Sequence, residues 1–342
     1  MNSSSTSSSS SSTPLLISSA LFAFSCLFAW RSPKNDSNDD YTLLRKAHSL
    51  RLSLSKPPLS QFRVVAILVT ERKELIFGTN VESYGSLTNT LCAERAACSQ
   101  YILQYPDQET RPFITTIYIV SDADVPISPG CLCREFLSGQ NLSASQTRIV
   151  MQSADSSSKP WVSCLQELFP RPSLYNRLNI QQQLELGTVL SSQQPFSGQS
   201  VGSLSQQDIL NLWNTAWQAA KSDVRDKVFP MHYGAAALIK VDDGIHRLVS
   251  ACALKAVEYG SSQDALCQLW TLVSKQLEQI TAVILVDQFG LLHTPAAVAR
   301  SIWAEYGGGS VPIILYKYDN TPKAELEAVP MDSLAPYVPK IW

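Results

Sequence analysis

The sequence predicts an α/β protein built from two consecutive copies of one layered unit. Expected helices and strands alternate, which is typical of helices packed on a sheet. The same order of elements occurs twice, which indicates an internal duplication. With 342 residues the chain is long enough for two separate cores, since one core rarely grows beyond about 250–300 residues.

The first copy is expected to begin with a helix and a hairpin. Apolar residues at helical spacing follow Tyr41, and residues 56–58 end that pattern. Two runs rich in β-branched residues then flank the charged residues 71–73, which predicts a hairpin. In order, the strands of the hairpin cover 62–70 and 74–82, and a helix at 89–105, a strand at 113–122, a helix at 133–140 and a strand at 147–153 follow.

The second copy is expected to repeat this order. Residues 171–205 are rich in Gln, Ser, Gly and Pro without a sustained period, which predicts a linker. The elements expected after it are a helix at 208–224, strands at 232–241 and 246–258, a helical run through Cys267, a strand at 280–287, a helix at 293–303 and a strand at 311–317.

The composition restricts the possible chemistry. A formal net charge of -2 provides no basic field for a polyphosphate, so nucleic acid is not an expected partner and a small, weakly charged substrate is favoured. The eight cysteines indicate free or metal-bound thiols, because a chain of this size needs no disulfide framework. None of the four histidines lies between residues 49 and 231, so a metal site there must depend on thiolates.

The first 40 residues are expected to form a separate leader. The serine run from Asn2 to Ser12 is disordered by composition. The apolar stretch from Pro14 to Trp30 is at the short limit for a membrane span, which predicts a membrane anchor or a targeting signal, with a merely hydrophobic leader as the alternative. Basic residues follow it, so a span would leave the rest of the chain facing the cytoplasm; a targeting signal would make the protein organellar.

Two short segments of the first copy carry residues suited to metal chemistry. Cys92 and Glu94 lie at an expected helix start, and "SPGCLCRE" (128–135) lies at the next turn from strand to helix. A helix N-terminus favours thiolate over thiol, so cysteines there are ready to bind zinc. Three thiolates leave one position of a tetrahedral zinc site for water, which Glu94 could serve as general acid and base. These are the components of hydrolytic deamination.

At these residues the sequence resembles the cytidine deaminase family. The segments that carry the resemblance are "SQFRVVA" (60–66), "NVESYGSLTNTLCAERAA" (80–97), "VPISPGCLCRE" (125–135) and "CLQELFP" (164–170). The resemblance implies a tandem pair of three-layer α/β/α units, each with a mixed sheet of about five strands. It also implies a catalytic domain at 41–170 and a degenerate domain at 206–342, joined by the linker 171–205.

The resemblance also implies the site. The enzyme would be a homodimer of pyrimidine salvage that hydrolyses cytidine or deoxycytidine. Position by position, Cys92, Cys131 and Cys133 would bind zinc, Glu94 would shuttle protons, Arg95 would bond to the zinc thiolates, Phe62 would pack on the pyrimidine, Asn80 and Glu82 would hold the ribose hydroxyl, and the backbone N–H of Ala93 would meet the base carbonyl.

One departure from the family pattern falls on a ligand. Where the family has Cys-Gly after the proline, this chain has Gly130-Cys131. A Cys-x-Cys at a helix start does not put both sulfurs on one face unless the backbone bends, which Gly130 would permit. Three outcomes stay open: Cys131 completes the site with altered geometry, water or another residue completes it, or no zinc binds.

The second copy is expected to have lost the chemistry. Aligned by sequence, Cys267 falls opposite Cys92, but Leu269 falls opposite Glu94, and Ala296 and Ala299 occupy the other ligand positions. This copy is therefore expected to serve packing and assembly. Two alternatives remain for the whole chain: a deaminase of a related base or nucleotide, and a catalytically silent paralogue that binds nucleosides or dimerises with an active relative.

Overall fold

The computed structural model describes residues 37–84, 90–139, 142–193, 196–227, 229–241, 245–256, 261–317 and 325–338. The chain divides into two compact units, Met1–Asp40 and Tyr41–Trp342. Both copies of the repeat lie in the second unit.

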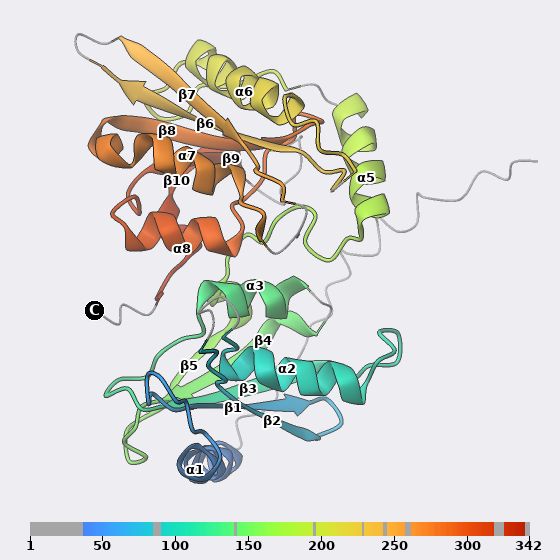
Figure 1. Cartoon of the computed structure of the whole chain (residues 1–342), viewed down its shortest axis with the longest axis vertical. Helices are drawn as coiled ribbons and strands as arrows, with labels where there is room; N and C mark the ends of the chain where they lie inside the picture. The colour runs from blue at the N-terminus through green and yellow to red at the C-terminus, as the bar shows by residue number, and fades with distance from the viewer. Residues whose placement is uncertain are drawn as a thin grey trace, which may run out of the picture. The chain divides into compact units, whose positions relative to one another are not determined.

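The first copy is built on a mixed sheet of five strands in the order β2-β1-β3-β4-β5 (Figure 1). All neighbouring strands are antiparallel except the parallel pair β3–β4. The expected hairpin is present as β1 and β2, and the register pairs Val65 with Thr79. The strands are β1 (Val64–Thr70), β2 (Leu75–Thr79), β3 (Ile114–Ser121), β4 (Ser143–Gln152) and β5 (Trp161–Cys164).

Helices cover both faces of this sheet (Figure 1). Leu44 and Ala47 of α1 pack on one face against Val65 and Ile67, while α2 and α3 contribute to a second core cluster on the other face. Burial on both faces explains why β1 and β3 are buried along almost their whole length and do not alternate between buried and exposed residues. The helices are α1 (Ser37–Ser53), α2 (Ala93–Gln104), α3 (Cys131–Gly139) and the short α4 (Leu165–Leu168).

The second copy repeats the first strand by strand. Its sheet has the order β10-β9-β8-β6-β7, again with a single parallel pair, β8–β9. The fold is therefore a tandem duplication of an α/β unit with a mixed five-stranded sheet, as the sequence predicts. Its elements are α6 (Gln206–Lys221), β6 (Tyr233–Lys240), β7 (His246–Cys252), α7 (Ala265–Val273), β8 (Ile280–Asp287), α8 (Ala297–Glu305), β9 (Pro312–Tyr316) and β10 (Leu326–Pro330), with 3-10 turns at Ser274–Gln279 and Met331–Leu334.

The segment between the two copies contains a helix that the sequence pattern did not indicate. Helix α5 (Ile180–Gln193) lies inside residues 171–205. Leu184 and Leu190 of this helix pack against a small cluster around Tyr175 and Met231. The apolar spacing is easily overlooked because Gln and Ser dominate the composition. The domain boundaries at 170 and 206 stay a prediction.

Two buried arginines, Arg134 and Arg300, occupy equivalent positions in α3 and α8. Both side chains are fully buried. Each guanidinium donates to a carbonyl that lies two residues before its own helix. Each also donates to a carbonyl near the C-terminal end of its own copy. Within the copies the bonds run from Arg134 Nε to Pro129 O (2.7 Å), Arg134 Nη1 to Leu168 O (2.5 Å), Arg300 Nε to Pro295 O (2.8 Å) and Arg300 Nη1 to Leu334 O (2.7 Å).

The same two guanidiniums also bond across the repeat. The acceptors include the carbonyls of Arg171 and Tyr337, two residues that share an uncommon left-handed backbone with φ of 51° and 56°. The duplication is therefore visible in the hydrogen bonds as well as in the strand order. The cross-copy bonds run from Arg134 to Pro336 O (2.7 Å) and Tyr337 O (3.0 Å), and from Arg300 to Pro170 O (2.8 Å) and Arg171 O (2.7 Å).

The expectation of a membrane anchor or organelle signal needs correction. In the part of the chain that the structure describes, no helix combines the length and the apolar character that a membrane crossing requires. The apolar stretch from Pro14 to Trp30, on which that expectation rested, lies outside the described residues.

Replacing Arg300 by Met should destabilise the protein although the site of the first copy is untouched. The change removes the donor from four carbonyls, two of them in buried bonds and two in partly buried ones, and an unpaired buried carbonyl costs about 1–3 kcal/mol. We expect the free energy of unfolding to fall by roughly 3 kcal/mol or more, measured by urea denaturation. Arg225→Met, which truncates an exposed arginine, is the control, and an equal loss in both variants would contradict this role.

Candidate metal centre

Three side chains of the first copy converge at the ends of two helices. One ligand atom from each of Cys92, Glu94 and Cys133 lies within 4.8 Å of the others. Cys92 is the N-cap of α2 and Glu94 lies in its first turn, while Cys133 is the third residue of α3. Two helix N-termini therefore direct their positive ends towards one cluster of acidic side chains, which favours the thiolate forms.

The start of α2 is held closely against the sheet. Val81 and Leu91 exchange backbone hydrogen bonds of 2.9 Å, which brings the chain back to the end of β2 just before Cys92. A Cβ on Gly78 of β2 would lie only 2.3 Å from the Ala93 carbonyl oxygen, so only glycine permits this approach. Cys92 itself has an extended backbone and makes no side-chain cap, so its sulfur is free for the cluster.

The two sulfurs of the centre differ in acidity. The hydrogen bond from Cys133, aided by the charge of Arg95, lowers the pKa of Cys92 to about 6. The same hydrogen bond, together with burial, raises the pKa of Cys133 well above its usual value. The pair therefore shares one proton near neutral pH, with the negative charge on Cys92.

The carboxyl of Glu94 is held between its two protonation states. Burial, followed by the nearby charge of Cys92, raises the pKa of Glu94 to about 7. Burial opposes the charge of Arg95, but the two thiols beside it outweigh burial and raise the pKa of Arg95. A carboxyl that titrates near neutrality can both accept and donate a proton, which general acid–base chemistry requires.

The predicted substrate residues Asn80 and Glu82 hold a loop in this structure. The Asn80 side chain accepts from Ser55 Oγ (3.0 Å) and Val64 N (2.9 Å) and donates to Phe62 O (2.8 Å). The Glu82 carboxylate accepts from the backbone N–H of Leu59 and Ser60 and from the Ser60 hydroxyl. Both residues therefore fix the segment 55–64, in which the half-buried Phe62 lies. Ala93, whose backbone N–H is predicted to meet the base carbonyl, is the first residue of α2 and directly follows Cys92.

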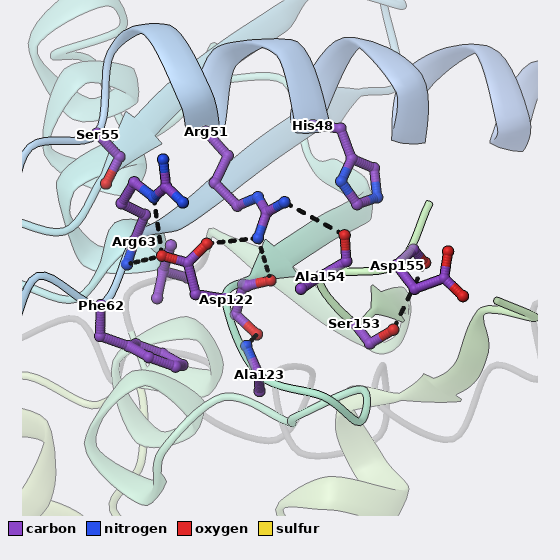
Figure 2. A network of polar contacts seen from close by, with 12 residues as sticks. His48, Arg51, Ser55, Phe62, Arg63, Asp122, Ala123, Ser153, Ala154 and Asp155 are labelled. Carbon is purple, nitrogen blue, oxygen red and sulfur yellow. Dashed lines mark hydrogen bonds and ion pairs between the residues drawn. The ribbon is translucent and has the colours of Figure 1, made fainter. Parts of the chain in front are cut away.

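A polar network anchors the other side of this segment. Asp122, at the end of β3, accepts from Arg51 Nη1 (2.5 Å), Arg63 Nε (2.8 Å) and Arg63 N (2.9 Å), and Figure 2 shows Phe62 beside it. Burial opposes the effect, but the bonds from Arg63 and the charge of Arg51 lower the pKa of Asp122. In the sequence, the only signal for these residues is an aspartate directly after a buried strand.

Cys131 is not brought into the metal-binding group. It is 2% exposed and belongs to the core cluster that also contains Ala297 and Ala335 of the second copy. Among the described residues, only Cys92, Glu94 and Cys133 form a group that could hold a metal ion. The ligand role of Cys131 stays a prediction that this geometry does not support.

The second copy has a different residue at the position of Cys92. Asp264 is the N-cap of α7, and the bridge between Leu254 and Gln263 just before it matches the bridge between Val81 and Leu91. The sequence alignment that placed Cys267 there is therefore wrong by three residues, because it matched cysteines rather than helix starts. Glu94 has Leu266 as its counterpart, which cannot exchange a proton.

The fold and the site together define a zinc-binding α/β unit of the deaminase class. Two thiols and a carboxyl are donors that zinc accepts, and their spacing suits one ion. Residues 37–147 match a family model described as the cytidine and deoxycytidylate deaminase zinc-binding region. In this region the chain belongs to that family.

Solved structures of cytidine deaminases are similar to parts of this chain. The enzyme of Burkholderia pseudomallei is 25% identical, with 39% of this chain and 97% of the enzyme covered and a TM-score of 0.33. The values for the Mycobacterium leprae enzyme are 25% identity, 39% and 98% coverage and 0.32. Those for a Mycobacterium tuberculosis enzyme are 31% identity, 31% and 83% coverage and 0.25. No curated protein matches the chain significantly.

Replacing Cys133 by Ala should remove tightly bound zinc, because the change deletes one of two sulfurs at the centre. Full-length protein loaded with zinc and then dialysed should retain less than a tenth of the wild-type zinc, measured by atomic absorption. Cys98→Ala is the matched control, since Cys98 is a buried thiol of α2 outside the group. Full retention of zinc by the Cys133 variant would exclude this centre.

Proposed function

We propose that this chain catalyses the zinc-dependent hydrolysis of cytidine or deoxycytidine, in which water replaces the exocyclic amine and ammonia leaves. The convergence of Cys92, Glu94 and Cys133 carries this proposal. The product is the corresponding uridine, so the reaction would belong to pyrimidine salvage. A homodimer stays a prediction.

Each residue of the centre has a separate task. Cys92 and Cys133 would hold the zinc ion, which supplies a Lewis acid that lowers the pKa of water. Arg95, whose Nη2 donates to the Thr90 carbonyl (2.9 Å), offsets the negative charge of the two sulfurs. Glu94 would take a proton from the attacking water and pass it to the ring nitrogen. It would then take the proton of the hydroxyl group now on the ring carbon and pass it to the departing amine, so that ammonia leaves and a carbonyl remains.

The surroundings favour a free nucleoside. Glu82 presents a carboxylate and Asn80 an amide at the same edge of the first copy, and both bond to the segment that contains Phe62. A sugar hydroxyl can bond to both groups, whereas a phosphate would be repelled by the carboxylate. The aromatic ring of Phe62 offers an apolar surface to a pyrimidine. Base and sugar would therefore both meet groups of the segment 55–64 or groups bonded to it.

Replacing Glu94 by Gln should abolish turnover while zinc binding is retained. The amide keeps the shape of the side chain but cannot exchange protons, so ammonia release from cytidine should fall at least about 1,000-fold. The zinc content of the full-length protein should stay at the wild-type value. Glu109→Gln, an exposed change beyond the end of α2, is the control. Equal rates in wild type and the Glu94 variant would exclude the proton-transfer role.

Replacing Glu82 by Gln should weaken the discrimination against phosphorylated substrates. The wild type should deaminate cytidine with a kcat/KM at least about tenfold above that for cytidine monophosphate, since like charges repel. In the Glu82→Gln variant, the ratio of kcat/KM for cytidine to kcat/KM for cytidine monophosphate should be smaller, measured with both substrates at equal ionic strength. A wild type that prefers the monophosphate would favour the alternative of a nucleotide deaminase.

A second candidate is a catalytically silent paralogue that binds nucleosides or pairs with an active relative. The observation that favours it is the placement of Cys131 outside the group, which leaves only two sulfurs at the centre. Zinc analysis and ammonia release from the full-length protein separate the two candidates. A folded wild-type protein that binds cytidine but holds no zinc and releases no ammonia would establish the silent paralogue.

A further inference from the structure

The geometry of α3 separates Cys131 from Cys133. Successive residues of a helix are rotated by about 100°, so residues two apart point in nearly opposite directions while residues three apart share a face. Cys133 contributes its sulfur to the centre, so the side chain of Cys131 is directed away from it. Cys131 is also 2% exposed and belongs to the hydrophobic core, as expected for a side chain outside the centre.

Gly130 lies three residues before Cys133, so towards the N-terminus it is the nearest position on that face. It directly precedes α3, and its carbonyl accepts the backbone N–H of Arg134 (3.1 Å), so it takes part in the first turn. A Cβ built on Gly130 would meet no heavy atom within 4 Å. Gly130 also does not belong to the glycines with positive φ in the described part of the chain. Neither packing nor backbone conformation requires glycine here, so the expected bend at Gly130 is not the reason for it.

We propose that the protein ligands of this centre are Cys92 and Cys133 with Glu94 beside them, that Cys131 is not a ligand, and that position 130 is where a third thiolate would stand. This inference rests on the zinc binding of the proposed function. The Gly130-Cys131 order therefore has a physical meaning. The thiol that the family pattern places at position 130 stands at position 131 in this chain, where it is part of the core. One substitution, Gly130→Cys, would place a thiol at this position, where a Cβ meets no heavy atom within 4 Å.

The test measures metal binding rather than turnover. Full-length proteins are titrated with zinc against a chromophoric chelator, and with cobalt(II), whose thiolate charge-transfer absorption grows with the number of bound sulfurs. Gly130→Cys should bind zinc about 10–100-fold more tightly than wild type and should raise the cobalt–thiolate absorption by roughly half. Cys131→Ala should leave both quantities unchanged within about threefold. Leu132→Cys, a new thiol on the exposed side of the same helix, should also change neither.

Opposite results would overturn the proposal. These are a loss of zinc affinity in Cys131→Ala as large as that in Cys133→Ala, or a Gly130→Cys variant that binds no better than Leu132→Cys. Cys131→Ser provides a second test if the alanine variant proves unfolded by circular dichroism. Zinc binding by wild type with the expected gain in Gly130→Cys, but no ammonia release from cytidine, would support the ligand assignment while rejecting the proposed enzyme activity.

Discussion

The arrangement of this chain depends on two buried guanidiniums that each bond to both copies of the repeat. Arg134 directly follows Cys133 in α3, and it donates to the carbonyls of residues 336 and 337 from the second copy. The next residue, Glu135, accepts the backbone N–H of Ala297 at the start of α8 (3.2 Å). Three consecutive residues of one helix therefore serve the metal centre, the joint between the copies and the other copy. The second copy thus helps to fix the orientation of the helix that carries Cys133.

A comparison of the two copies separates the residues of the metal centre, which differ, from the residues that hold the fold together, which are alike. Its helix α7 begins at Asp264, whose carboxylate caps the helix by accepting from Leu266 N (2.7 Å), and burial raises the pKa of that carboxyl. A cap needs one acceptor only, whereas a metal centre needs several donors in one place. Arg300, by contrast, keeps the same pattern of bonds as Arg134. The buried-arginine framework is the same in both copies, whereas Asp264 and Leu266 stand at the positions of Cys92 and Glu94.

Local patterns in the sequence were sufficient for the hairpin, for the main helices and for the duplication, because strand and helix periodicities are properties of neighbouring residues. The convergence of Cys92 and Cys133 could also be expected, since both lie at helix starts above one sheet. The bonds of Asp122 to Arg51 and Arg63 could not, because they join residues about 60–70 positions apart and leave no periodic trace. The direction of the Cys131 side chain could not be predicted for another reason. It depends on the exact residue at which α3 begins, and helix starts are the least certain feature of a sequence pattern.

The acceptors of the two arginines are main-chain carbonyls throughout, apart from the Ser128 hydroxyl. Every residue carries such a carbonyl, so the joint does not depend on which side chains occupy the closing segments. The two copies indeed differ there, with Pro170-Arg171 in one and Pro336-Tyr337 in the other. A joint of this kind tolerates sequence divergence, because mutations can alter those side chains without removing a bond. The second copy could accordingly lose the residues of the metal centre and still hold the first copy through the same bonds.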